Sequence, residues 1–108
     1  MYKIYKIKNR KDSKKYIGMT SRDIHTRFKE HLSNKNIFVD ICMRNIGVKN
    51  FEFEEIYSCN TEREARYFEK YFIVLYDSLY PNGYNRTCPG RDASFIYNEL
   101  SGKQMRLI

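Results

Sequence analysis

The sequence is poor in cysteine, and the cysteines that it has follow no pairing pattern. Its 108 residues contain three of them, an odd number at irregular positions: Cys42, Cys59 and Cys88. They form no C-x-x-C motif and no cysteine and histidine pairing of the kind that holds zinc. We therefore expect free thiols in a reducing compartment and no zinc centre.

Long apolar runs are also missing. No stretch approaches the roughly 20 consecutive apolar residues that a membrane-spanning helix needs. The N-terminus lacks the apolar segment of a signal peptide. Together these absences predict a soluble, intracellular protein with no membrane partner.

Acidic residues are outnumbered by basic ones. The chain has 20 Lys and Arg against 13 Asp and Glu, which gives a formal net charge of +7. Such an excess favours a polyanionic partner, and nucleic acid first. Taken singly, each lysine is equally explained as a solvated side chain on an exposed strand edge or turn. The candidate DNA-binding residues lie in the N-terminal part, and they are Lys6, Lys8, Lys14, Lys15 and Arg22.

The length allows one domain. A chain of this size fits a single compact unit of about 100 to 150 residues. Hydrophobic residues make up 42% of it, which is enough for a packed core. We expect the domain to span residues 1–88, and residues 89–108 to form a tail or the start of a linker.

Two short alternating segments predict a hairpin. Residues 2–8 alternate strictly, and residues 15–19 follow a polar turn as a second run with strand character. An antiparallel hairpin is the simplest arrangement of the two, and it brings Tyr5 and Tyr16 onto neighbouring strands. Neither face of the first strand is purely apolar, which favours tyrosines displayed on the surface.

Three helices and a further strand are predicted downstream. Residues 22–32 follow a capping box, Thr20-x-x-Asp23, and carry an apolar residue at every fourth position, at Ile24, Phe28 and Leu32. A helix over residues 37–45 ends at Gly47, and residues 51–57 alternate as a strand. The longest helix opens with Thr61-x-x-Glu64, and its apolar stripe consists of Ala65, Phe68, Phe72 and Leu75.

Glu69 is the first candidate site residue, because it lies beside that apolar stripe. A carboxylate there is costly to desolvate unless a cation or a hydrogen-bond donor meets it. Mg²⁺ accepts one carboxylate together with waters and phosphate oxygens, so a single Glu can suffice. Taken alone, a Glu beside Lys70 and near Arg66 is more typical of a surface ion pair.

Two further pairs of polar residues are candidates for the site. Arg27 and His31 are one helical turn apart, and they offer a fixed cation for a phosphate and a group that can donate near neutral pH. Arg27 can also simply pair with an acidic neighbour on its helix. Tyr5 and Tyr16 can act as bases only if nearby positive charge lowers a phenol pKa of about 10, and most tyrosines in such a sheet are packing residues.

Taken together, these segments closely resemble the GIY-YIG nucleases, in order and in spacing. The resemblance covers roughly residues 3–87, and its downstream part looks most like the phage, viral and intron-encoded homing branch of that family. The matching segments are Ile4-Tyr5-Lys6-Ile7-Lys8-Asn9, Lys15-Tyr16-Ile17-Gly18-Met19-Thr20, Arg27-Phe28-Lys29-Glu30-His31-Leu32, Gly47-Val48-Lys49-Asn50-Phe51-Glu52-Phe53-Glu54, Glu69-Lys70-Tyr71-Phe72-Ile73 and Pro81-Asn82-Gly83-Tyr84-Asn85.

The resemblance implies a role for each of the polar residues. Glu69 would bind one divalent ion, Mg²⁺ or Mn²⁺, and Arg27 would steady the scissile phosphate of DNA. Tyr5 or Tyr16 would activate or position the attacking water, and the sequence does not decide which. His31 would assist proton transfer or orientation.

The resemblance also implies a fold. It is an α/β (α+β) fold with a small three-stranded antiparallel sheet flanked by helices, in which Asn85 would brace the site. One position departs from the family pattern, since Lys3 stands where the first motif has glycine. We expect this change to be tolerated, because a strand does not otherwise require glycine.

Two other functions remain open at this point. A DNA-binding module that keeps the fold and charge without cutting would explain the basic surface. A protein-interaction domain would use exposed aromatic residues as its contact patch. The target sequence and the oligomeric state are not determined by the sequence.

Overall fold

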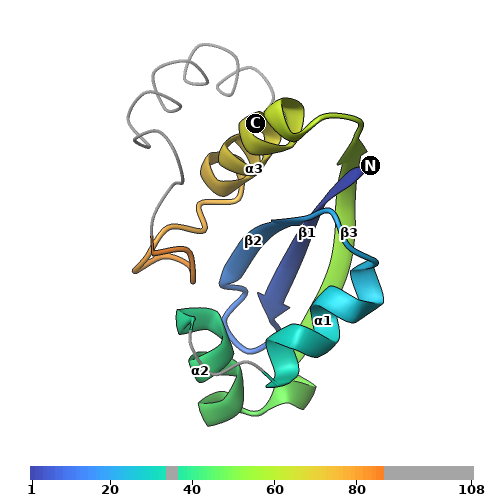
Figure 1. The fold of residues 1–108 in the computed structure, drawn as a ribbon. Helices are drawn as coiled ribbons and strands as arrows, with labels where there is room; N and C mark the ends of the chain where they lie inside the picture. Colours follow the sequence, from blue (N-terminus) through green and yellow to red (C-terminus); the bar gives the residue numbers. More distant parts are fainter. Residues whose placement is uncertain (34–36, 87–108) are drawn as a thin grey trace.

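The computed structural model describes residues 1–33 and 37–86 (Figure 1). Its elements follow in the order β1 (Tyr2–Asn9), β2 (Lys15–Thr20), α1 (Ile24–Ser33), α2 (Phe38–Ile46), the 3-10 turn η1 (Val48–Asn50), β3 (Phe51–Cys59) and α3 (Glu62–Leu75). The strands form one antiparallel sheet in the order β2-β1-β3. The predicted fold class is therefore confirmed, whereas Cys88 and residues 89–108 lie outside the described residues.

Helices cover the central strand β1 on both of its faces. Ile4 packs in a cluster with residues of α3, and Tyr5 and Ile7 pack in a second cluster with residues of α2. Figure 1 shows α3 on one side of the sheet and α1 and α2 on the other. The expectation of displayed tyrosines is wrong for Tyr5, whose exposed fraction is 0%. Both faces of the central strand carry buried residues because a helical layer lies on each side, whereas Lys3, Lys6 and Lys8 stay partly exposed.

Helix α1 begins and packs differently from the sequence prediction. Its cap is Asp23, which accepts a hydrogen bond from the amide of Thr26, whereas the hydroxyl of Thr20 accepts from the amide of Arg22. The predicted apolar residue Leu32 is 51% exposed, and the neighbouring His31 is buried at 1%. The helix turns His31 toward the core because His31 finds hydrogen-bond partners there.

The ends of the other helices agree with the prediction. Gly47 has a φ of +114°, and its amide donates to the carbonyl of Met43 at the end of α2. Thr61 caps α3 by accepting a hydrogen bond from the amide of Glu64. The end of α2 and the start of α3 could therefore be predicted, because both depend on hydrogen bonds between residues close in sequence.

Within residues 1–33 and 37–86, no helix is both long enough and apolar enough to span a membrane. Cys42 and Cys59 are free thiols, as predicted. The predicted reducing compartment is not tested by this finding.

Gly18 of β2 allows the ring of Tyr5 to lie flat against the neighbouring strand. Gly18 is the register partner of Tyr5, and a Cβ at this position would lie 2.3 Å from Cζ and 2.4 Å from the hydroxyl oxygen of Tyr5. The ring has little freedom to move away, because it packs against Phe28 and its hydroxyl is hydrogen-bonded to His31.

We expect Gly18→Ala to lower the free energy of unfolding by about 2 to 3 kcal/mol, because an added methyl group must displace a buried ring. Urea unfolding of Gly18→Ala, Tyr5→Val and the double variant measures this effect. The cost of the alanine should largely disappear when the ring is absent. Additive costs in the double variant would contradict the proposed contact.

Candidate active site

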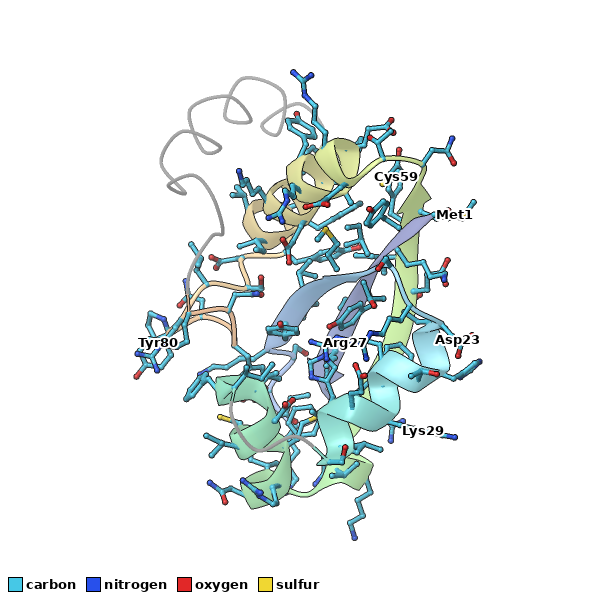
Figure 2. All side chains as sticks on the ribbon, in the orientation of Figure 1. Met1, Asp23, Arg27, Lys29, Cys59 and Tyr80 are labelled. Atoms are coloured by element: carbon cyan, nitrogen blue, oxygen red, sulfur yellow. The ribbon has the colours of Figure 1, made fainter. Side chains whose placement is uncertain are left out.

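Side chains from four elements meet at the β2 edge of the sheet. Tyr5 comes from β1, Tyr16 from β2, Arg27 and His31 from α1, and Glu69 from α3. Figure 2 shows Arg27 directed from α1 toward the sheet, whereas Lys29 of the same helix points away from the domain. The sequence therefore brings four of its predicted residues together through one hairpin and one helix, and Glu69 joins them from the helix on the other side of the sheet.

A continuous chain of hydrogen bonds links α1, β1 and α2. The Nε of Arg27 donates to the hydroxyl oxygen of Tyr5 over 3.1 Å, and this hydroxyl is hydrogen-bonded to Nε2 of His31 over 2.7 Å. Nδ1 of His31 lies 2.6 Å from a carboxylate oxygen of Asp40. Each group in the chain thus fixes the orientation of the next one.

Sequence reasoning missed Asp40. A signal was present, because Asp40 is the single charged residue in the otherwise apolar stretch 37–43. In α2 it lies on the buried face with Val39 and Met43, and its exposed fraction is 3%. A charge at a core position of an amphipathic helix is uncommon unless it is paired.

The two tyrosines differ in their access to solvent. Tyr5 is fully buried, whereas Tyr16 on the edge strand stays partly exposed. Burial raises the pKa of Tyr16 to about 12, the Glu69 carboxylate raises it as well, and Arg27 lowers it. Burial also raises the pKa of Tyr5 far above its ordinary value. Of the two side chains, only that of Tyr16 is accessible to solvent.

Glu69 is half-buried and lies beside the apolar stripe of α3, as its pattern predicted. Ala65 and Ile73, four residues before and after it, are both fully buried. Ile73 takes the place that the prediction gave to Leu75, which is only partly buried. The buried residues of α3 are therefore shifted slightly from the predicted stripe, and the carboxylate of Glu69 is close enough to Tyr16 of β2 to raise the pKa of its hydroxyl.

Within residues 1–33 and 37–86, no counter-charge is in direct contact with the carboxylate of Glu69. Burial raises its pKa to about 7, and the more distant Arg66 and Lys70 lower it only in part. Arg66 forms its ion pair with Glu62, and no described residue forms a hydrogen bond or ion pair with Glu69. The surface ion pair considered from the sequence is thus not what the structure contains.

The surroundings of Glu69 fit a cation with few protein ligands. No group of three or more His, Cys, Asp or Glu side chains that could enclose a metal occurs within residues 1–33 and 37–86. A hard cation such as Mg²⁺ needs only one carboxylate if waters and phosphate oxygens complete its shell. An uncompensated, largely buried carboxylate has the chemistry for that single contact.

Arg27 also faces an open cleft of about 380 Å³. Its Nη1 is 3.3 Å from Glu30, and the same carboxylate binds Arg22. The pairing of Arg27 with an acidic neighbour is therefore real, but it accompanies the bond to Tyr5 and does not replace it. The cleft lies between β2, the start of α1 and the start of α3, and its lining includes Arg22, Arg27, Glu30 and Glu62.

Asn85 is bound to the outer edge of β2. Its Oδ1 accepts from the amide of Ile17 and from the hydroxyl of Ser78, and its Nδ2 donates to the carbonyl of Ile17. The amide of Tyr84 adds a bond to the carbonyl of Lys15. With both ends of its amide committed to the protein, Asn85 holds the strand on which Tyr16 lies.

The candidate DNA-binding residues form two groups. Lys6, Lys8 and Lys15 lie together on β1 and β2, where the ammonium groups of Lys6 and Lys15 are 5.1 and 5.9 Å from the ring centre of Tyr76. Burial and the charges of Lys8 and Lys6 lower the pKa of Lys15. Lys14 is exposed in the hairpin turn nearby, and Arg22 lies apart, at the cleft.

Lys3, at the position of the first motif's glycine, is accommodated without strain. It lies within β1 opposite Thr20, and its ammonium group donates to the carbonyl of Arg22 over 3.0 Å. The expectation that a strand position tolerates this side chain agrees with the observed contacts.

Together, the fold and this edge site define a nuclease domain. The chain belongs to the GIY-YIG family, because the family model described as the GIY-YIG catalytic domain matches residues 1–85.

Solved structures agree with this assignment. The catalytic domain of the homing endonuclease I-TevI matches with a TM-score of 0.68 and 23% identity, over 81% of this chain and 99% of that one. A glutamate-to-alanine mutant of the catalytic domain of the intron endonuclease I-TevI matches with a TM-score of 0.62 and 27% identity, over 79% and 93%. Among curated proteins, none is similar enough to count as a match.

We expect Glu69→Gln to stabilise the metal-free protein at alkaline pH. Glu69 has a pKa of about 7 in the fold against an ordinary 4.5, so the folded state binds this proton more tightly. The stability that the proton adds is complete below pH 4.5 and is lost as the pH rises through 7. At pH 8 in EDTA the variant should exceed the wild type by about 2 kcal/mol, and at pH 4.5 the two should be similar.

Urea unfolding at several pH values measures this difference. Glu55→Gln is the matched control, because Glu55 is exposed on the opposite edge strand β3. The control should follow the wild type at every pH. Equal stabilities of Glu69→Gln and wild type at pH 8 would show that the carboxylate is well solvated.

Proposed function

We propose that this domain hydrolyses phosphodiester bonds of DNA with the help of one divalent metal ion held by Glu69. The observation that carries the proposal is the uncompensated carboxylate of Glu69, which raises the pKa of the two tyrosines and thus lies within electrostatic reach of them. When bound, Mg²⁺ or Mn²⁺ would supply positive charge to the leaving oxygen.

Each remaining side chain has a role that its position supports. Arg27 lines the cleft and would neutralise the extra charge that the phosphate gains in the transition state. Tyr16, partly exposed, would position the attacking water. Tyr5 and His31 are buried, and they would act by holding Arg27, whereas Asn85 would hold Tyr16 through β2.

The DNA would lie along the β2 edge of the sheet. The lysine group formed by Lys6, Lys8 and Lys15 would contact one part of the backbone, and Arg22 at the cleft would contact another. Lys14 in the turn extends the first group. We also propose that the catalytic domain ends near residue 88, and that residues 89–108 form a tail or begin a linker.

The competing function is a DNA-binding module of the same fold that does not cut. It requires the basic residues but not the carboxylate of Glu69, since a buried carboxylate weakens the binding of a polyanion. The presence of Glu69 beside Arg27 and Tyr16 favours the cleaving enzyme.

We expect the protein to nick supercoiled plasmid DNA with Mg²⁺ and to be inactive in EDTA. Glu69→Gln should lower the rate by at least about 100-fold, because it removes the charge that would bind the ion while keeping the shape of the side chain. Agarose gels at low salt measure the rate. Glu55→Gln on the opposite edge strand is the control and should keep full activity.

Metal binding can be measured apart from cleavage. Mg²⁺ or Mn²⁺ should raise the Tm of the wild type in the absence of DNA, because an ion that binds only the folded state stabilises it. The same ions should leave the Tm of Glu69→Gln unchanged. DNA binding without cleavage under every divalent ion tested would support the non-cutting module.

We expect Lys8→Gln and Lys15→Gln each to weaken DNA binding and to reduce the salt dependence. Each lost phosphate contact should lower the slope of log K against log salt by about 0.9. Fluorescence anisotropy with a labelled duplex between 50 and 200 mM salt measures this slope. Lys29→Gln is the matched control, since Lys29 points away from the sheet (Figure 2). If the slope of log K against log salt is unchanged in both variants, Lys8 and Lys15 do not contact the DNA backbone.

A further inference from the structure

Asp40 is a buried carboxylate that the proposed cleavage chemistry does not use. Its side chain is 1% exposed, and it lies on the face of α2 that packs into the core with Val39 and Met43. Burial raises its pKa, whereas the contact with His31 lowers it. An apolar residue would pack at this position without that desolvation cost.

Among the described residues, the side-chain hydrogen bonding of Asp40 is directed at one group. Its Oδ1 lies 2.6 Å from Nδ1 of His31. Its Oδ2 is buried and has no hydrogen-bond partner in the part of the chain that the structure describes. A core carboxylate with one hydrogen-bond partner lowers the stability of the fold through its desolvation. We therefore look for its role in its effect on that partner.

We infer that Asp40 is a positioning residue, which holds His31 in the tautomer protonated on Nδ1 so that Nε2 accepts the hydroxyl hydrogen of Tyr5. This inference rests on the proposed function for its catalytic consequence, but the tautomer itself is a property of the free protein.

The tautomer follows from the directions of the hydrogen bonds. A carboxylate only accepts hydrogen bonds when it is ionised, and in that state the nitrogen that faces Asp40 must carry the hydrogen. Burial lowers the pKa of His31, so the ring is neutral near pH 7 and its other nitrogen is left as an acceptor. The hydroxyl of Tyr5 can then donate to Nε2.

The opposite tautomer would change this order. A hydrogen on Nε2 would make His31 donate to the hydroxyl oxygen of Tyr5 together with Arg27, and Tyr5 would then have to give its own hydrogen to another group, the hydroxyl of Tyr16. It would also turn a nitrogen lone pair toward the ionised carboxylate of Asp40, which is repulsive. The hydrogen bonds therefore run in one direction, from Arg27 through Tyr5 and His31 to Asp40.

The consequence for the reaction is the placement of Arg27. With its hydroxyl hydrogen given to His31, Tyr5 offers a lone pair to Nε of Arg27, and this contact fixes the guanidinium at the cleft. Asp40 contacts neither the cleft nor Arg27, so it acts through two intervening side chains, His31 and Tyr5. A positioning group of this kind alters the rate of the chemical step more than the binding of DNA.

The first experiment observes the tautomer in the wild-type chain, by two-dimensional NMR that correlates the ring nitrogens and carbons of histidines. The chain has two histidines, and exposed His25 is the internal reference. We expect His31 to carry its hydrogen on Nδ1 at pH 7. A hydrogen on Nε2 of His31 overturns the inference without any variant.

The second experiment compares cleavage kinetics of Asp40→Asn, His31→Gln and the double variant. We expect Asp40→Asn to lower kcat by about 10-fold to 100-fold with KM within about twofold, and to redistribute the His31 tautomers. In the His31→Gln background the same substitution should have no further effect on kcat, because its action passes through the imidazole. Asp12→Asn makes the same chemical change at an exposed turn and is the matched control.

Several results would overturn the inference. An equal fall in kcat with and without His31 shows that Asp40 does not act through the imidazole. If Asp40→Asn does not fold, the wild-type tautomer remains the deciding measurement. A wild-type chain that never cuts DNA contradicts the proposed function alone, since the tautomer is measured without DNA.

Discussion

The buried hydroxyl of Tyr5 is the contact on which the rest of the site depends. A phenol in a core must satisfy its polar end, and here Arg27 and His31 do so from one helix. These two bonds dock α1 on the sheet at a fixed rotation, and His31 then reaches Asp40 of α2. The ring itself can lie there only because Gly18 has no Cβ. One side chain thus connects the central strand, its neighbour and two helices.

The candidate site lies at an edge strand, where side chains from both faces of the sheet can meet. Arg27 approaches from the α1 side and Glu69 from the α3 side, and β2 lies between them. An edge strand normally exposes unpaired backbone groups. In this domain the amide of Asn85 binds one part of that edge, and the partly exposed ring of Tyr16 lies next to it. The same short strand β2 is therefore held in place by Asn85 and exposes Tyr16 to solvent.

Two carboxylates in the domain cost stability. Glu69 is half-buried on α3 and Asp40 lies in the core, and among the described residues Glu69 has no counter-charge in contact and the Asp40 carboxylate has one partner. Neither arrangement is expected in a sequence selected for stability alone. Glu69 acts electrostatically on the two tyrosines at the β2 edge, and Asp40 contacts His31.

The sequence by itself determined the elements, their order and the identity of most polar groups, because strand alternation, helix caps and Gly47 act over a few residues. It could not determine which faces are buried. Tyr5 is buried and Leu32 exposed because two helical layers enclose β1 and because His31 finds partners in the core, and both facts depend on contacts between residues far apart in the chain. For the same reason the isolated charge of Asp40 in its apolar stretch did not reveal its partner, and only the packing of α2 against α1 brought it to His31.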